Sequence, residues 1–344
     1  MIKSLQAWRF VFAMMVVICH LTRHFSFGGE GSVVFFFILS GFVLAQRYGD
    51  DINRNTFSTT RLLRRQIGKM YPLYLTTLLV VAVLDAKLGV VYGVLRTVLC
   101  ILLLQSWIPS PSYCYAINGP AWFLSSLLFL YLIFRQLYVR LFHWSLQRVV
   151  AAMILLIGAY VAFALTASSA VPYLDDVLCV FPPFRVIDFA IGILLARFCQ
   201  SQHGICVRRF LKFRSSVLTS LSCTAILIVA IFVFQASPIH LRDAAMWLFF
   251  PLFIVGFALT DGRTPLSAFM GHSWLQKLGA VSFDIYLTHM LSFRIIGHLL
   301  IAAGVYELTA LRVPCMLVGC IAVAVLFHWL LKLPNAVFFQ FKTL

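Results

Sequence analysis

Residues 5–20 read LQAWRFVFAMMVVICH, an apolar stretch that contains one arginine and ends in a histidine. Comparable apolar blocks of roughly 17 to 25 residues recur along the chain, the length that a helix needs to cross about 30 Å of hydrocarbon. Of the 344 residues, 62% are hydrophobic and 11% are charged, and the mean hydropathy is +0.96. This composition leaves too little polar surface for a soluble globule. The sequence therefore predicts an all-α, polytopic integral membrane protein with about ten transmembrane helices in one bundle.

The apolar blocks predict ten spans and leave one segment ambiguous. We place the spans at residues 4–22, 32–46, 70–86, 121–139, 149–167, 183–198, 215–234, 243–260, 278–302 and 311–331. Residues 89–108 are apolar but contain Arg96, so they form either an eleventh span or a half-helix on the outer side. Lys and Arg decide between these topologies because they accumulate in short cytoplasmic loops. Ten spans with a cytoplasmic N-terminus put nineteen Lys and Arg residues inside and five outside, so we expect the half-helix and two cytoplasmic termini.

The chain shows no sign of a second domain. Residues 1–21 have a basic start and an apolar core but no small-residue cleavage site, so we expect a retained first span. We find no internal repeat, low-complexity linker or appended soluble domain, and we expect a single membrane domain over residues 1–344. The nine cysteines are odd in number and lack C-x-x-C spacing, which favours packing roles. One bridge among Cys100, Cys114 and Cys179 is the alternative.

Charged groups inside the hydrocarbon are costly and mark candidate functional sites. In the predicted spans these groups are Arg9, His20, Arg185, Asp188, Asp284, His289, Arg294 and His298. The spacing of Arg9 and His20 puts them on one helix face, about 20° apart around the axis and about 16 Å apart along it. One face then carries a cation toward the cytoplasm and a titratable base toward the outer leaflet. The alternatives are that Arg9 snorkels to the interface and that His20 caps the outer end of the span.

A basic segment precedes the third span. Residues 60–74 read TRLLRRQIGKMYPLY, which we interpret as a loop that carries Arg61, Arg64, Arg65 and Lys69. Guanidinium groups bind phosphate through forked hydrogen bonds, so the cluster is a candidate phosphate site. Topological anchoring or contact with anionic lipid is the alternative, and the commoner reason for such a loop. Short basic loops also account for most of the net charge of +16, so we expect no nucleic-acid partner.

Small and charged residues within two other spans predict contacts between helices. Residues 31–42 read GSVVFFFILSGF, in which Ser40 and Gly41 allow close helix approach and the phenylalanines pack. In the sixth span, Arg185 and Asp188 lie on one helical face and predict an intramembrane ion pair. The role of this pair is structural or catalytic.

The ninth span carries a polar face. Its first turns read SFDIYLTH, with Ser282, Tyr286 and His289 on one side of the helix and Asp284 on another. A histidine in the middle of the bilayer has few explanations besides function. A hydrogen bond from His289 to a neighbouring helix is one of them.

Six fragments of the chain resemble the acyltransferase-3 family of membrane-bound O-acyltransferases. They are the first-span Arg-x10-His pattern of Arg9 and His20 within 5–20, FFFILSGFVL at 35–44, RLLRRQIGKMYPLYL at 61–75, NGPAWFLSSLLFLYL at 118–132, FRVIDFAIG at 184–192 and LGAVSFDIYLTH at 278–289. The resemblance implies transfer of an acyl group, usually acetyl, from cytoplasmic acyl-CoA to a hydroxyl of an envelope glycan or another acceptor. It also implies a location in the cell membrane, and we expect the inner membrane of a bacterium.

The chain departs from the family pattern at two positions. Many relatives have an acidic residue before the second-span phenylalanines, where this chain has Val34, with Glu30 nearby. Many also have a glutamate after the Trp-x-Leu-Ser motif, where this chain has Leu127. If those carboxylates act in relatives, another group serves here or the acceptor differs.

The resemblance and the residues together predict a site. We expect catalysis by His20, Arg9 and His289, donor phosphates on Arg61, Arg64 and Arg65, and substrate contacts from Glu30, Arg185, Asp188 and Ser282. His20 would act as a general base or as a transient acyl carrier. The partners would be acetyl-CoA or another acyl-CoA as co-substrate, a glycan or lipid-linked sugar as acceptor, and membrane lipids, with no permanently bound cofactor. No ligand set with metal spacing appears, so we expect no metal.

A protein of another class would use the same charges differently. In a transporter or flippase of a lipid or glycan they would line a pathway, but the inverted repeats and broken helices of such proteins are missing from the sequence. A structural or sensory membrane protein would leave Arg9, His20 and His289 unexplained.

Overall fold

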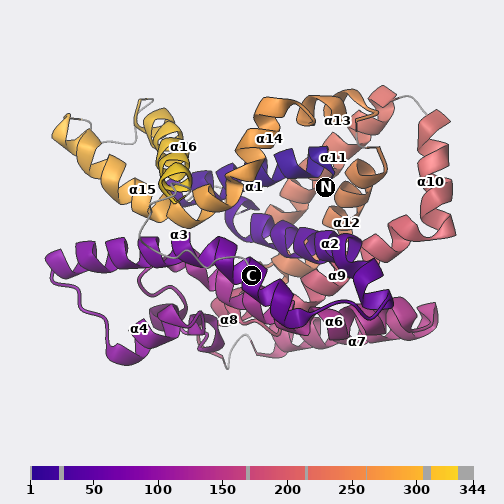
Figure 1. The fold of residues 1–344 in the computed structure, drawn as a ribbon, viewed down its shortest axis with the longest axis horizontal. Coiled ribbons are helices and arrows are strands. Elements are labelled where there is room, and N and C mark those ends of the chain that lie inside the picture. Colours follow the sequence, from indigo (N-terminus) through magenta and orange to yellow (C-terminus); the bar gives the residue numbers. More distant parts are fainter. Residues whose placement is uncertain are drawn as a thin grey trace.

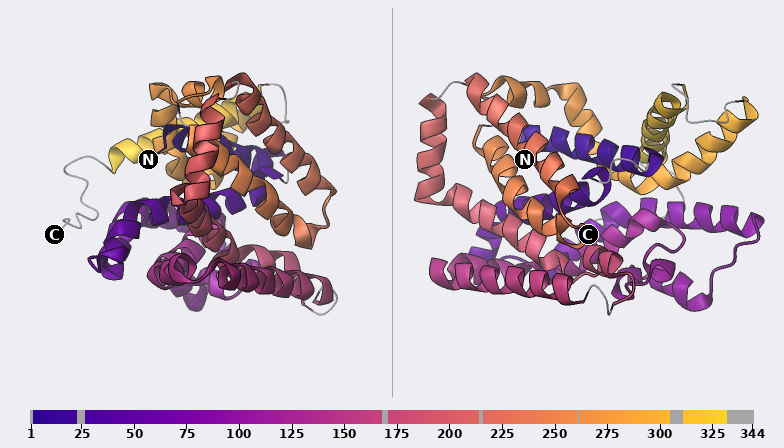
Figure 2. Two further views of the ribbon diagram at one scale, coloured as in Figure 1. Left: turned by 90° about the vertical axis from the view of Figure 1, so that its right-hand side faces the viewer. Right: turned by 180° about the vertical axis from the view of Figure 1, so that it is seen from behind.

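The computed structural model describes residues 2–22, 27–167, 171–213, 216–260, 262–304 and 311–331. Within these ranges every regular element is a helix. Figure 1 shows the helices gathered into one bundle, with α15 and α16 at one end and α10 at the opposite end. The view from behind in Figure 2 shows the same arrangement.

Ten helical segments of the described chain are long and apolar enough to cross a membrane. The principal helix of each is α1 (Lys3–Thr22), α2 (Ser32–Asn53), α3 (Thr59–Lys87), α6 (Trp122–His143), α7 (Leu146–Thr166), α9 (Arg185–Gln200), α11 (Ser216–Ala236), α12 (Arg242–Thr260), α15 (Ser282–Ala302) and α16 (Arg312–Leu330). The predicted all-α membrane fold with ten spans is confirmed.

Short elements connect the spans. They are η1 (Phe27–Gly31), α4 (Val94–Ile101), η2 (Gln105–Trp107), α5 (Pro111–Cys114), η3 (Gly119–Ala121), α8 (Leu174–Val180), α10 (Gln202–Phe213), η4 (Ile239–Leu241), α13 (Pro265–Met270) and α14 (Ser273–Ala280). The segment that the sequence leaves ambiguous contains α4, which has 8 residues. At about 1.5 Å per residue this helix is too short to cross the hydrocarbon, so it is a half-helix as expected.

The basic segment before the third span is helical, which corrects the prediction of a loop. Helix α3 begins at Thr59, and the Ser58 hydroxyl at its N-cap accepts a hydrogen bond from the Arg61 backbone N–H at 3.3 Å. Arg, Leu and Gln are good helix formers, so the helix extends beyond the apolar block that defines the span. Arg61, Arg65 and Lys69 are spaced four residues apart and therefore share one face of α3.

Helix α2 lies in the middle of the bundle and crosses α9 at close range. Its span is 72% buried, whereas the spans of α7 and α16 are each 17% buried, so those two helices face outward. A Cβ atom on Gly41 would lie 2.1 Å from the carbonyl oxygen of Phe189, and one on Gly192 would lie 2.0 Å from that of Ile38. Glycine at both positions lets the two backbones meet, as the sequence predicts for Gly41.

Helix α1 is held by contacts along its length. Gly279 of α14 packs against the backbone of Gln6, where a Cβ would approach the carbonyl oxygen to 2.2 Å. Further along, the ring of Phe12 stacks on that of Phe35 in α2 at 3.9 Å. These contacts fix the helix that carries Arg9 and His20.

Candidate active site

A cavity of about 610 Å³ opens between α1, α2, α3, α6, α15 and α16. Its polar and charged lining residues are Gln6, Arg9, Ser40, Arg47, Gln66, Lys69, Tyr131, Ser282, Asp284, Tyr286 and His328. The cavity therefore contains Arg9 and Ser282 of the predicted site. The side chains of Arg47 and Lys69 are exposed, so they lie where the cavity opens.

Arg9 presents its guanidinium to this cavity without a partner among the described residues. No hydrogen bond or ion pair joins its side chain to another described residue, and Tyr131 and Asp284 line the same cavity. Among the described lining residues are three cations, Arg9, Arg47 and Lys69, and one carboxylate, that of Asp284. Such a wall attracts a ligand with several negative charges.

Asp284 is paired with a histidine of the last described helix. The Nδ1 atom of His328, in the last turn of α16, lies 2.5 Å from Oδ2 of Asp284 near the start of α15. Both side chains line the cavity. This contact joins two spans at the wall that faces Arg9.

His20 and His289 meet outside this cavity. Their ring centroids lie 5.0 Å apart, with His289 fully buried and His20 exposed. Nδ1 of His20 lies 2.9 Å from the Val16 carbonyl oxygen, and Nδ1 of His289 lies 2.6 Å from that of Tyr286. A carbonyl only accepts, so each ring donates from Nδ1, and in the neutral ring Nε2 is left as the acceptor. Nε2 of His289 is buried without a partner among the described residues.

Three aromatic rings in the cavity lining form a cluster that reaches the histidine pair through Tyr286. The rings of Phe36, Phe123 and Tyr286 lie 5.3–6.3 Å from one another, and all three line the cavity. Tyr286 also contacts the ring of His289 at 6.0 Å, and its hydroxyl donates to the Pro120 carbonyl at 3.1 Å. We call these three residues the aromatic neck.

The predicted phosphate cluster lies outside the cavity wall. Arg61, Arg64 and Arg65 are exposed, and Nη1 of Arg65 donates to the Tyr48 hydroxyl at 3.4 Å. The next residue of their helical face, Lys69, does line the cavity. The arginines therefore continue the cationic face of α3 outward from the cavity mouth.

Three predicted substrate residues belong to a separate polar network. The guanidinium of Arg185 binds Asp188 at 2.9 Å and Asp243 at 2.5 Å, and its other donors reach the Leu178 and Cys179 carbonyls. The predicted ion pair is thus present, and its bonds join α9 to α12 and α8. Glu30 of η1 lies 3.7 Å from the guanidinium of Arg242. None of these groups lines the cavity.

The remaining predicted groups are the Ser282 hydroxyl and the cysteines. The Ser282 hydroxyl lines the cavity and donates to the Gly279 carbonyl at 2.8 Å. All nine cysteines lie within the described residues, and all are free thiols. The alternative of one bridge is therefore not realised in this structure.

Most of the lining residues lie outside the predicted site, among them Arg47, Lys69, Tyr131 and His328. By sequence, Arg47 is a topology-setting charge, Lys69 belongs to the basic segment before the third span, Tyr131 is part of an apolar span, and His328 lies at the end of the last block. The signal that could have found His328 is a histidine in the final turn of a span, facing the same side of the membrane as Arg9.

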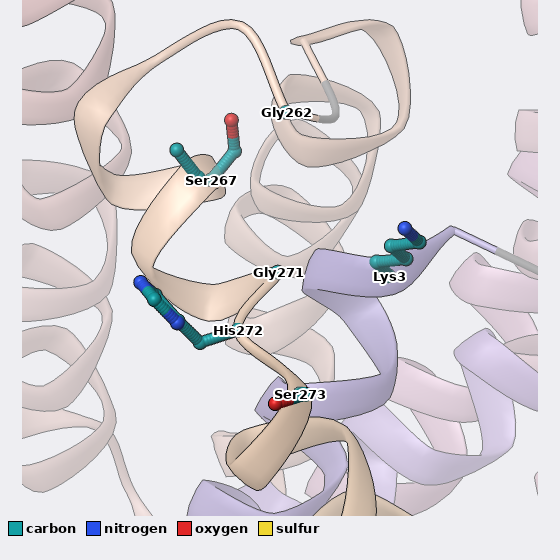
Figure 3. A pocket seen from close by; sticks show the side chains of 7 residues that line it. Lys3, Gly262, Ser267, Gly271, His272 and Ser273 are labelled. Carbon is teal, nitrogen blue, oxygen red and sulfur yellow. The ribbon is translucent and has the colours of Figure 1, made fainter.

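A second cavity, of about 530 Å³, lies beside the start of α1. Figure 3 shows Lys3 on one side and Gly262, Ser267, Gly271, His272 and Ser273 around the other. The Ser267 hydroxyl is bonded to the Thr260 and Thr264 carbonyls in the turn before α13. No predicted site residue lines this cavity.

Comparison with known proteins identifies the family. The model of a family described as Acyltransferase domain matches residues 2–329. The chain belongs to the acyltransferase-3 family. The chain is similar to Acyltransferase MdmB from Streptomyces mycarofaciens, with 29% identity over 328 residues. The match covers 86% of this chain and 80% of that protein. No solved structure matches significantly.

These matches make the chain a membrane acyltransferase and confirm the family that its six fragments indicate. The two departures from the acyltransferase-3 pattern now have a structural setting. Val34 is fully buried, while Leu127 lines the cavity that contains Arg9. Among the described lining residues of this acyltransferase, Asp284 is the one carboxylate.

Proposed function

We propose that this acyltransferase transfers an acetyl group from cytoplasmic acetyl-CoA to a hydroxyl of a cell-envelope glycan or lipid-linked sugar. The observation that carries the proposal is the arrangement of a cationic cavity and a histidine pair on either side of the aromatic neck. CoA is an anion with a long flexible arm, which suits a wide charged mouth and a narrow apolar passage. In their neutral forms the histidines would offer Nε2 as an acceptor where the arm would end.

The donor would extend along α3 and into the bundle. Its phosphates would contact Arg61, Arg64 and Arg65 and the cavity mouth, and its pantetheine arm would pass Arg9. The axial rise of about 16 Å between Arg9 and His20 suits an extended arm. Arg9 would stabilise negative charge on the donor because its guanidinium lines the cavity without a partner among the described residues.

The chemical step would use the histidine pair. Nε2 of His20 takes the proton of the acceptor hydroxyl while the hydroxyl oxygen attacks the thioester carbonyl carbon. The carbon–sulfur bond then breaks, and the CoA thiolate receives the proton from His20. His289 would assist by orienting the acceptor through its buried Nε2. In the second version of this step, His20 carries the acyl group itself before the acceptor receives it.

The orientation in the membrane is part of the proposal. We place the chain in the cell membrane of a bacterium with both termini in the cytoplasm, because this topology puts most Lys and Arg inside. It also makes the mouth lined by Arg47 and Lys69 cytoplasmic, where acyl-CoA is found. Labelling of single cysteines, introduced into a variant that lacks the nine native ones, by a membrane-impermeant maleimide tests it. Labelling of Gln202→Cys from the outside would contradict it.

The decisive experiment measures acyl transfer directly. Purified protein in lipid nanodiscs is mixed with acetyl-CoA and candidate glycans, and thiol release is followed for the wild type, His20→Ala, Arg9→Ala and the control His143→Ala. We expect acceptor-dependent release in the wild type and the control, and at least a hundredfold loss in His20→Ala. Full activity in both site variants would overturn the mechanism. Movement of a glycan across vesicles without consumption of acetyl-CoA would instead support a transporter.

A further inference from the structure

The contact between Asp284 and His328 lies in the cavity wall, although most of the helix that carries His328 faces away from the bundle. The span of α16 is 17% buried and faces outward along most of its length, yet its last turn directs His328 into the cavity wall. Nδ1 of His328 lies 2.5 Å from Oδ2 of Asp284, within hydrogen-bond distance of the carboxylate. The histidine therefore engages the only carboxylate of the described cavity lining.

Asp284 and Arg9 are natural partners that the structure keeps apart. They line the same cavity, their helices pack against each other, and their opposite charges attract. No ion pair of 4.0 Å or less joins them. An arginine and a carboxylate that meet in a poorly hydrated site form paired hydrogen bonds, so an Asp284 side chain turned toward Arg9 would compete with an anionic ligand for it.

We propose that His328 is a positioning residue that holds Asp284 away from Arg9 and so keeps the Arg9 guanidinium available to the acyl-CoA donor. This inference rests on the proposed function, because it assumes that the cavity binds acyl-CoA. His328 acts through Asp284 and needs no contact with the donor. Its loss releases the carboxylate toward Arg9, and the donor then has to displace an internal ion pair before it binds.

This role predicts that one substitution repairs the other. In His328→Ala, Asp284 swings to Arg9 and CoA binding weakens. In Asp284→Asn the competing charge is absent, so CoA binds at least as tightly as to the wild type. In the double variant the competitor is again absent, and the missing histidine no longer matters. A purely structural role for His328 predicts the opposite, because the double variant would lose the packing of α16 as the single variant does.

The test is a binding cycle that needs no acceptor. Isothermal titration calorimetry with coenzyme A is run on purified wild type, His328→Ala, Asp284→Asn and the double variant in lipid nanodiscs. The control is His143→Ala, an exposed histidine in the last turn of another span. Size-exclusion profiles and thermal unfolding confirm that each variant is folded. We expect Kd to rise about tenfold or more in His328→Ala and to return to within about twofold of Asp284→Asn in the double variant.

The outcomes separate this inference from the proposed function. A double variant as weak as His328→Ala, or a His328→Ala variant that binds like the wild type, would overturn the positioning role alone. A wild type that binds no coenzyme A would overturn the proposed function and this inference together. A double variant that recovers coenzyme A binding and still unfolds as early as His328→Ala would support the role, because the change in binding would not follow the change in stability.

Discussion

The buried Nε2 of His289 has no hydrogen-bond partner among the described residues, while the ring of His20 lies with its centroid 5.0 Å from that of His289. An unpaired buried polar atom is costly unless a ligand completes it. Helices α1 and α15 bring together two imidazoles whose Nδ1 atoms are both used on carbonyls of their own helices. Both rings are thus held in one tautomer by local backbone, which leaves their Nε2 atoms for chemistry.

Replacing His289 by alanine should reduce turnover without weakening the binding of the acyl-CoA donor. Because His289 lies beyond the aromatic neck, we expect CoA binding within about twofold of the wild type and thiol release lower by about 10² to 10⁴. Calorimetry and steady-state thiol release measure the two effects. If the histidines act as a unit, His20→Ala combined with His289→Ala is no slower than the slower single variant. Losses that multiply would contradict a shared role.

The arginines of α3 should recognise the phosphate end of the donor only. We expect Arg61→Gln combined with Arg64→Gln to raise the KM for acetyl-CoA by about threefold to tenfold, since exposed charges contribute modestly. Acetyl-pantetheine lacks those phosphates, so its kinetics should not change. Arg208→Gln combined with Arg209→Gln, on exposed α10, is the matched control. Equal losses with both donors would show that the cluster acts on folding or topology instead.

Widening the aromatic neck should relax the choice of acyl chain. Phe36→Ala removes one of the three rings of the aromatic neck. We expect the ratio of kcat/KM for butyryl-CoA to that for acetyl-CoA to rise about tenfold, in the range that extra methylenes contribute in apolar pockets. Phe232→Ala, at an outward-facing position of α11 that is 70% exposed, should leave the ratio unchanged. An unaltered ratio in Phe36→Ala would mean that the acyl group does not pass the neck.

The crossing of α2 and α9 should tolerate no side chain at its glycines. A Cβ on Gly192 would lie 2.0 Å from the Ile38 carbonyl oxygen, so Gly192→Ala must separate two central helices. We expect a loss of about 1–3 kcal/mol or more in stability, seen as earlier thermal unfolding in detergent. In Gly158→Ala on α7 the added Cβ meets no atom within 4 Å, and unfolding should not be earlier. Similar behaviour of the two variants would contradict the close crossing.

The predictability of the fold and that of the site have different physical origins. The ten spans follow from apolar block length, because a helix must satisfy its own backbone hydrogen bonds in hydrocarbon. Arg9 and His20 share a face because both lie on one helix, so residue spacing sufficed. The helical start of α3 was missed because residues 61–69 include four charged side chains. Hydropathy identifies apolar blocks and does not detect a helix that continues outside one. Propensity and the Ser58 cap decide that stretch.

The sequence by itself determined what is local: helix, span and the cost of a charge placed within a span. Only the tertiary structure decided which charges meet, because partners such as Asp284 and His328, or Arg185 and Asp243, come from different helices whose rotation is fixed by packing. It placed Arg185 and Asp188 in a network between helices and opened a cavity at Arg9. It also brought His289 to His20. The rotation of each helix depends on its contacts with all its neighbours, such as that of Gly41 with Phe189. These contacts involve several segments, so the sequence of one segment does not determine the rotation.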